Sequence, residues 1–386
     1  MTIVAAIISG LFCAQYLRII WRQRLVNELS RTSPPEPASW PSLTIVLPAC
    51  NEAETISEAM ASLRGIDYPN LRIVVVNDRS TDETGALLDA CAEQDSRITA
   101  IHNDHLPEGW LGKVHALHLG AQRADSDWLL FSDADVHLSP GALRRAVAYA
   151  EAEGLDHLPL CPDLSSRSLW TNTAIATFHL QMLILVNPSH VYDPKRPEAV
   201  GIGAFNLVRG EVFRRSEGFD WLRLDVADDF ALGMMLKRAG ARSELVYGHE
   251  LVRVEWYPNV PSMIGGFEKN AYGALGHYSL AHTVGQLGAG AIALTLLLWP
   301  LFTQGPSATS VAIAVAPLLA LWSAGLVMAR RVGWPAHRFL LVPVGLPLLM
   351  YGVLNGLWRG WRDGGISWRG TFYSADALRA GQRVKL

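Results

Sequence analysis

Charged residues are scarce in this sequence. Only 18% of its 386 residues are Asp, Glu, Lys or Arg, 50% are hydrophobic, and the mean hydropathy is +0.17. An average soluble protein carries about 25% charged residues. This shortage excludes an ordinary water-soluble enzyme along the whole chain and predicts that part of it lies in a membrane.

The sequence also lacks an excess of positive charge, and its cysteines form no pattern typical of a metal site. The chain has 33 basic against 36 acidic residues, a net charge of -3. A nucleic-acid partner is therefore not expected, because such binding needs a basic surface. The four cysteines show no metal-ligand spacing, and unpaired thiols are expected in a reducing compartment. They are Cys13, Cys50, Cys91 and Cys161.

Long apolar runs lie toward both ends of the chain. Each is close to the ~20 residues that cross a bilayer. They are 2–21, 285–303, 308–328 and 339–358. The first lacks a basic start and a cleavage site, which favours a retained anchor over a signal peptide. Basic residues at 18–31 and 330–338 predict a multi-pass inner-membrane protein with a cytoplasmic central domain and an external loop at 304–309.

The predicted segments follow from these runs. They are a membrane anchor (1–24), a Pro-rich linker (25–41), a cytoplasmic domain (42–284), C-terminal membrane segments (285–358) and a basic, aromatic interfacial tail (359–386). Four full spans would place this basic tail outside. Because Pro343 and Pro347 interrupt the last run, we expect it to form a re-entrant hairpin.

The central region alternates short apolar runs with helical patterns. Strands are expected at 43–47, 72–76, 99–102 and 128–131, and helices at 52–63, 83–93 and 114–124. Strict alternation predicts an α/β, Rossmann-like domain with a mainly parallel sheet. A further apolar stretch at 174–186 fits either a membrane-contacting helix or a buried core helix.

Polar residues follow the ends of these strands. Asn51 and Glu52 follow the first, Asp78 the second, and Asp133 and Asp135 the last. In such sheets ligands bind beyond the carboxyl ends of the strands. Residues i and i+2 of an extended segment point the same way, so Asp133 and Asp135 are expected to share one divalent cation.

Four motifs in order resemble glycosyltransferase family 2, whose members are inverting enzymes that use nucleotide-diphosphate sugars. They read TIVLPACNEAETI, VVVNDRSTDET, GWLGKVHALHLGA and LLFSDADV. Three later stretches resemble the membrane-anchored branch with hopanoid-associated and carotenoid-modifying glycosyltransferases. These are GIGAFNLVRGEVFRRSEGFD, VADDFALGMMLKRAG and WRGTFYSADALR. The resemblance implies a GT-A nucleotide-diphospho-sugar transferase fold.

The resemblance also implies roles for single residues. Pro48, Asn51 and Glu52 correspond to the first nucleotide-contacting turn. Asp78 corresponds to the acid that recognises the base, although Asn77 replaces the usual second Asp, so a UDP-sugar is expected from the family alone. Lys113 resembles the basic residue near the donor phosphates.

The catalytic centre is assigned in the same way. Asp135 would hold Mg²⁺ or Mn²⁺ against the diphosphate, and Asp133 would hold the ribose or share the ion. DVADDFALG resembles the Glu-Asp motif of the family, which makes Asp229 the expected catalytic base with Asp228 beside it. Paired carboxylates oppose each other's ionisation, which can raise one pKa. The alternative is that both only favour the positive helix N-terminus.

The sequence also bears on the number of sugars transferred and on the kind of acceptor. Processive synthases carry Q-x-x-R-W where this chain has GGFEKNAYG, which favours single transfer, and Lys269 there is a candidate diphosphate contact. Gly201 and Gly203 are expected to approach the acceptor closely. Membrane anchors favour a lipid acceptor at the bilayer surface. A processive polysaccharide synthase, a transporter and a non-enzymatic scaffold remain alternatives.

Overall fold

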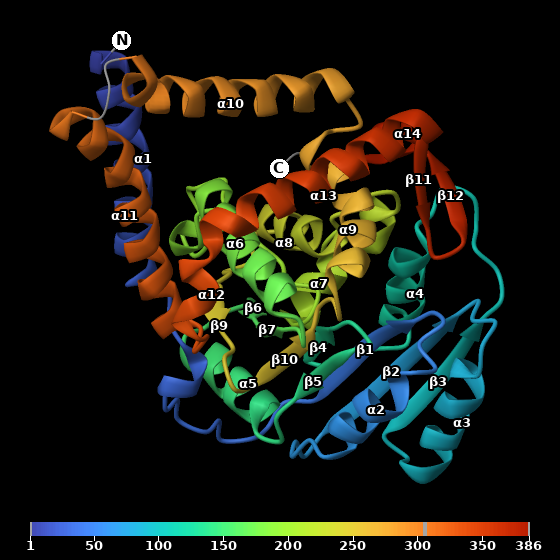
Figure 1. Ribbon diagram of the computed structural model, residues 1–386. Coiled ribbons are helices and arrows are strands. Elements are labelled where there is room, and N and C mark those ends of the chain that lie inside the picture. The colour runs from blue at the N-terminus through green and yellow to red at the C-terminus, as the bar shows by residue number, and fades with distance from the viewer. Residues whose placement is uncertain (1, 304–306, 385–386) are drawn as a thin grey trace. The chain divides into compact units, whose positions relative to one another are not determined.

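The chain forms two compact units in a computed structural model, which describes residues 2–303 and 307–384. A sheet unit contains Val26–Ser165, Pro188–Tyr257 and Gly365–Leu386, and a helical unit contains Met1–Leu25, Ser166–Asn187 and Pro258–Gly364 (Figure 1). Both units are therefore assembled from segments that are distant in the sequence. The predicted external loop at 304–309 falls partly outside the described residues.

A seven-stranded sheet organises the sheet unit, in the order β3-β2-β1-β4-β8-β6-β9. The strands are β1 (Leu43–Ala49), β2 (Leu71–Asp78), β3 (Ile98–Asn103), β4 (Trp128–Phe131), β6 (His157–Cys161), β8 (Asn206–Arg209) and β9 (Val246–Tyr247). The four strands from β3 to β4 run parallel, whereas β8 is antiparallel to both of its neighbours. The sheet is mixed and mainly parallel, as the sequence predicts.

Smaller elements complete this unit. A three-stranded sheet contains β5 (Val136–Leu138), β10 (Val252–Glu255) and β7 (Asp163–Ser165), and a hairpin contains β11 (Gly365–Trp368) and β12 (Thr371–Ser374). The helices are α2 (Ile56–Arg64), α3 (Thr84–Gln94), α4 (Gly112–Ala121), α5 (Ala142–Ala152), α7 (Gly210–Arg215), α8 (Asp228–Arg238) and α14 (Ala375–Gly381).

Helices cover both faces of the central sheet. Ile73 and Val75 of β2 belong to the main core with side chains of α2, α3 and α5. The intervening Val74 and Val76 pack with Ala116 of α4 on the other face. Alternate residues of a strand point to opposite faces, so a strand buried on both sides is an unbroken apolar run. This explains why the central strands could be located from composition.

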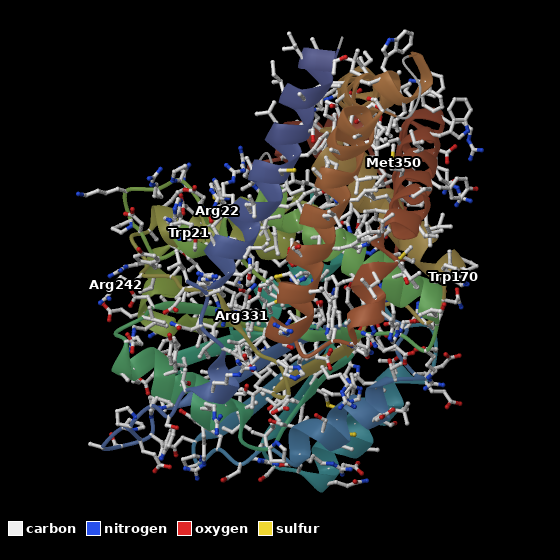
Figure 2. The ribbon with its side chains drawn as sticks, turned by 60° about the vertical axis from the view of Figure 1, so that its left-hand side comes forward. Trp21, Arg22, Trp170, Arg242, Arg331 and Met350 are labelled. Carbon is white, nitrogen blue, oxygen red and sulfur yellow. The ribbon has the colours of Figure 1, made fainter. Side chains whose placement is uncertain are left out.

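The helical unit contains three helices, among the described residues, that are long and apolar enough to cross a membrane. They are α1 (Thr2–Gln23), α10 (Leu280–Thr303) and α11 (Ala308–Arg331). The unit also contains α6 (Leu169–Leu185), α9 (Val260–Lys269), α12 (Ala336–Leu340) and α13 (Val342–Asp363). Large apolar side chains of this unit are exposed, among them Trp21, Trp170 and Met350, labelled in Figure 2.

Two sequence expectations for these helices are resolved. The expected re-entrant hairpin is wrong, because α13 is one continuous helix of 22 residues. Pro343 lies in its first turn, where a missing N–H costs nothing, and Pro347 is accommodated inside it. Most side chains of α6 are buried, including Ala174 and Leu180, which favours the core-helix alternative.

The compact units also divide the chain differently from the predicted segments. Residues 258–284, expected in the cytoplasmic domain, lie in the helical unit, and the tail from Gly365 onward lies in the sheet unit. The tail forms a hairpin and a helix with buried Ile366, Leu378 and Val384. Long-range packing of this kind has no local sequence signal.

Candidate active site

The Asp-x-Asp pair lies beyond the carboxyl end of β4, in the turn that leads to β5. The segment is not extended as expected, because residues 134 and 135 form the turn itself. The two carboxylates are nevertheless close enough to interact. Burial, together with the charges of Asp133 and Glu52, raises the pKa of Asp135 to about 6. This centre therefore concentrates negative charge and favours a cation.

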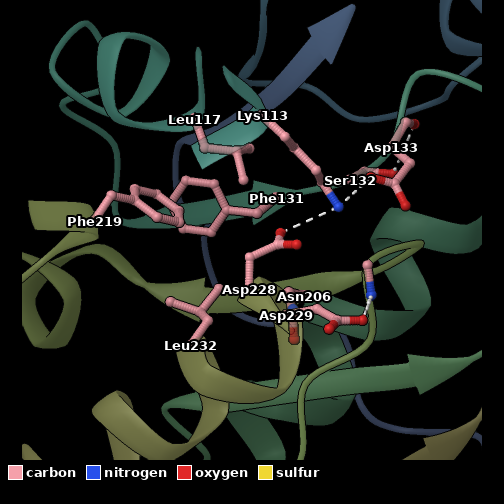
Figure 3. Close-up of a pocket in the computed structure, with 11 residues that line it drawn as sticks. Lys113, Leu117, Phe131, Ser132, Asp133, Asn206, Phe219, Asp228, Asp229 and Leu232 are labelled. Atoms are coloured by element: carbon pink, nitrogen blue, oxygen red, sulfur yellow. Dashed lines mark hydrogen bonds and ion pairs between the residues drawn. The ribbon is translucent and has the colours of Figure 1, made fainter. Parts of the chain in front are cut away.

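Lys113 joins the Asp-x-Asp segment to α8. It lies in the first turn of α4, and its Nζ is 2.8 Å from Asp133 Oδ1 and 3.1 Å from Asp228 Oδ2 (Figure 3). Burial alone would lower the pKa of Lys113, but the charges of Asp133, Asp228 and Asp229 outweigh burial and raise it. The ammonium group is thus charged and holds these carboxylates together.

Asp228 and Asp229 are the first two residues of α8. Asp229 Oδ2 accepts a hydrogen bond from Gly203 N at 2.9 Å (Figure 3). Asp229 Oδ1 accepts a second one from Phe230 N at 2.8 Å. Burial and the neighbouring charge of Asp228 raise the pKa of Asp229, which Lys113 opposes. The result is a fixed carboxylate with increased basicity, as a general base requires.

One pocket collects these groups. Its lining includes Lys113, Asp133, Gly203, Asp228 and Asp229 (Figure 3). Residues separated by more than one hundred positions in the sequence therefore face a common space. The carboxylate of Asp133, the ammonium group of Lys113 and the acidic pair Asp228 and Asp229 can together bind a charged donor and remove a proton from an acceptor.

Gly201 and Gly203 pack closely against other parts of the site, and their expected approach to the acceptor stays a prediction. A Cβ at Gly201 would lie 1.8 Å from the backbone oxygen of Asp229. A Cβ at Gly203 would lie 2.8 Å from Asp133 Oδ2 and 3.4 Å from Asp229 Oδ2. These glycines therefore permit close approach of the α8 turn and of two carboxylates, and close approach to an acceptor is not needed to explain them.

The two glycines give a matched prediction. Gly203→Ala is expected to reduce sugar transfer strongly and stability little, because the Asp133 carboxylate can turn aside but then leaves its position. Gly201→Ala is expected to fold poorly, because its Cβ meets rigid backbone. Expression level, melting temperature and initial rate of both variants check this. Equal melting temperatures would contradict the packing argument.

The turns after β1 and β2 form an adjoining edge. Asn51, with φ 54°, accepts a hydrogen bond from Thr81 N at 2.8 Å and donates from its own N to Ser80 Oγ at 3.0 Å. Pro48 lies within β1. The predicted nucleotide-contacting turn is thus fastened to the loop after the next strand. Its contact with a nucleotide stays a prediction.

Asp78, the predicted base-recognising acid, is 3% exposed. Its carboxylate accepts hydrogen bonds from Arg79 Nε at 3.1 Å, Arg79 Nη2 at 2.8 Å and Asn103 Nδ2 at 2.7 Å. A carboxylate offers about four acceptor positions, so little capacity is left for a base N–H. Asn77, which replaces the usual acid, lies 3.1 Å from His102 through its Nδ2.

The C-terminal hairpin brings residues to this edge that sequence reasoning missed. Arg79 Nη1 donates to Thr371 Oγ1 at 3.1 Å, and Gly112 N donates to Tyr373 OH at 3.2 Å. Arg369 Nη2 lies 2.6 Å from Glu52 Oε1. The tyrosine thus satisfies an N–H at the start of α4 that lacks a helical partner. Gly370, between strand-like residues, was the only local hint of this hairpin, because the preceding Arg369 is not a typical turn residue.

The same tail also reaches the segment before α8. The backbone N–H groups of Arg383 and Val384 both donate to Asp225 Oδ2 at 3.1 Å. Asp225 is buried and precedes Asp228 by three residues. Lys269, by contrast, ends α9 in the helical unit, so its suggested contact with a diphosphate stays a prediction.

The fold and pocket define the class: a GT-A-like α/β enzyme with an acidic site at the carboxyl ends of its strands. Residues 44–215 match the model of Glycosyl transferase family 2. This match covers less than half of the chain. Together with relatives that are named glycosyltransferases, it supports the conclusion that the protein is a glycosyltransferase.

Relatives extend this similarity. A protein of Staphylococcus aureus (strain USA300) named 4,4'-diaponeurosporenoate glycosyltransferase is 25% identical over 343 residues, 86% of this chain and 88% of the relative. The namesake protein of Staphylococcus haemolyticus (strain JCSC1435) is 23% identical over 59% of this chain and 60% of its own length. An uncharacterized glycosyltransferase of Haemophilus influenzae is 23% identical, covering 60% of this chain and 70% of the relative.

A solved structure supports the fold. The mannosyltransferase PcManGT from Pyrobaculum calidifontis, in complex with GDP-Man and Mn²⁺, aligns with a TM-score of 0.54 at 19% identity. The alignment covers 93% of this chain and 99% of that one.

Proposed function

We propose that this enzyme transfers a single sugar, with inversion, from a nucleotide-diphosphate donor to a lipid acceptor at the membrane surface. The observation that carries the proposal is the shared pocket of Lys113, Asp133, Asp228 and Asp229. A UDP-sugar is the expected donor. The names of the staphylococcal relatives and the three apolar helices support an acceptor of carotenoid or other lipid type.

The site suits a divalent cation delivered with the donor. Asp135, whose pKa is raised by burial and by the charges of Asp133 and Glu52, would hold Mg²⁺ or Mn²⁺ with Asp133. Within 2–303 and 307–384, no group of three His, Cys, Asp or Glu residues could hold a metal ion. Mg²⁺ is commonly bound by one or two carboxylates plus substrate phosphates. When bound, the ion would neutralise charge on the departing diphosphate.

The remaining steps belong to the chain's own residues. Asp229 takes the proton of the acceptor hydroxyl as its oxygen attacks the anomeric carbon on the face opposite the phosphate. The bond to the phosphate oxygen breaks in the same displacement, so the anomeric centre inverts and no enzyme nucleophile is needed. Lys113 and Asp228 hold Asp133 and the base in one arrangement.

The test uses the full chain in membranes with a panel of labelled UDP- and GDP-sugars, followed by mass spectrometry of extracted lipids. The proposal expects lipids that carry one added sugar, and loss of this product with EDTA or in Asp135→Ala. Long saccharide chains would instead indicate a processive synthase. No product with any donor, and no donor hydrolysis, would refute the function.

A further inference from the structure

The hairpin of β11 and β12 has an unusual residue at its tip. Trp368 pairs with Thr371, which leaves Arg369 and Gly370 as a two-residue loop. Both have positive φ, 49° and 77°. Such loops favour Asn-Gly or Asp-Gly, because a side chain beyond Asn or Asp rarely adopts positive φ at the first position. An arginine there is unfavourable for the turn itself, which directs attention to what its guanidinium contacts.

The guanidinium lies over the carboxyl end of β1. Arg369 Nη1 donates to the backbone oxygen of Cys50, and Nη2 is 2.6 Å from Glu52 Oε1. Cys50 and Glu52 follow β1 directly, at the edge where open α/β sheets bind their ligands. The side chain of Arg369 is 47% exposed, so it keeps donors available for a ligand.

The strand that follows the tip, β12, is held at this edge by two contacts. Arg79, after β2, bonds Thr371, and Gly112, at the start of α4, bonds Tyr373. Since these two anchors lie in different loops of the sheet unit, the position of Arg369 is set by the fold and not by its own ion pair.

The charges of the site define what this arginine can bind. Glu52 and Arg369 both interact electrostatically with Asp135, which places the guanidinium beside the acidic centre. A diphosphate entering there must overcome repulsion from several carboxylates. Arginine is suited to this, because its planar fork binds two phosphate oxygens at once.

We propose that Arg369 at the hairpin tip binds the diphosphate of the nucleotide donor, so that the C-terminal hairpin is part of the donor site. The inference rests on the proposed function. The guanidinium of Arg369 would donate two charge-assisted hydrogen bonds to phosphate oxygens. It would then release Glu52 and bind phosphate instead, while the contacts of Thr371 and Tyr373 keep the hairpin in place.

Arg369→Asn on the full chain separates this role from a structural one. Asn suits positive φ better than Arg, so the turn is expected to keep or gain stability while the guanidinium is lost. The dissociation constant for UDP or GDP with Mn²⁺, measured by calorimetry, is expected to rise about tenfold or more, the loss typical of a charged hydrogen bond. Arg369→Lys is expected to restore part of the affinity.

Two controls test whether the loss of affinity comes from the lost contact between Arg369 and phosphate. Arg379→Asn makes the same change on an exposed arginine of the same tail, which forms an ion pair with Asp376, and should leave affinity unchanged. The preference of the wild type for UDP over UMP, or GDP over GMP, should shrink in Arg369→Asn, which identifies phosphate and not base as the lost contact.

The outcomes are distinguishable. If the wild type transfers sugar but Arg369→Asn binds nucleoside diphosphates equally well, this inference is overturned and the proposed function stands. A lowered melting temperature with unchanged affinity would give the arginine a structural role and also overturn it. If the wild type neither binds nucleoside diphosphates nor transfers sugar, the proposed function falls and this inference falls with it.

Discussion

Asp229→Asn is expected to slow sugar transfer by about 10²- to 10⁴-fold, because an amide cannot take the proton of the acceptor hydroxyl. Binding of UDP or GDP with Mn²⁺ should change little, since the proposed role of Asp229 is toward the acceptor and not toward the nucleotide. Initial rates with saturating donor, together with calorimetric titration of the nucleotide, check both expectations.

Asp229→Asn is also expected to lower the stability of the protein by a smaller amount. Its two oxygens accept the N–H groups of Gly203 and Phe230, whereas Asn keeps one acceptor and turns an NH₂ toward the other N–H. One backbone donor is then left without a partner, which costs about 1–3 kcal/mol. A melting curve separates this loss from the loss of rate.

Two comparisons make the assignment falsifiable. Asp220→Asn changes a carboxylate whose side chain is 62% exposed, in a short helix before α8, and should leave the rate unchanged. If Asp228→Asn abolished transfer while Asp229→Asn remained active, the base would be Asp228 and the expected assignment would be reversed.

Lys113→Met is expected to impair both stability and transfer. The lysine side chain is 19% exposed and contacts Asp133 and Asp228, so its removal leaves buried carboxylates without compensation. Breaking a buried ion pair in this way costs about 3–5 kcal/mol. Because Asp133 is 39% exposed, solvent screens part of the charge and the lower end of this range is expected.

The loss should depend on pH in a defined direction. Burial and neighbouring carboxylates raise the pKa of Asp135 and Asp229, and Lys113 opposes both shifts. Without the ammonium group, the folded-state pKa values of these two carboxyl groups should rise further above the unfolded values. The variant is then penalised at neutral pH, and the penalty falls as the pH is lowered and the carboxylates are protonated. Melting temperatures of wild type and Lys113→Met should therefore converge toward acidic pH.

Lys195→Met serves as the matched control, because Lys195 is exposed on the surface of the same unit. It should melt like the wild type at every pH. A difference between wild type and Lys113→Met that did not change with pH would show that lost packing, and not charge, causes the destabilisation.

Much of the sheet could be predicted from the sequence. The expected strand at 128–131 coincides with β4, and the expected 72–76 lies inside β2. Central strands buried on both faces are apolar throughout, and each is bounded by polar residues. The convergence of Asp133 with Lys113 follows from the same rule, because the carboxyl ends of parallel strands share one edge.

The local geometry of the candidate active site was harder to predict from the sequence. The Asp-x-Asp segment was expected to be extended, but its residues must leave β4 and reverse into β5, which a turn achieves. The approach of Gly201 to Asp229 is a contact between segments far apart in sequence, and glycine alone does not reveal its neighbour. The return of Arg369 to the loop after β1 is a tertiary contact of the same kind.

The sheet unit is built from chain segments that lie before and after the helical segment Pro258–Gly364, which affects when it can fold during translation. Residues 365–386 of the sheet unit leave the ribosome only after the whole of Pro258–Gly364 has been synthesised. Until then, Glu52 lacks Arg369, and Asp225 lacks the amides of Arg383 and Val384. A nonsense codon within 258–364 should therefore inactivate the enzyme although residues 44–215 are translated intact, and activity should begin only once the apolar helices of the helical unit have been translated.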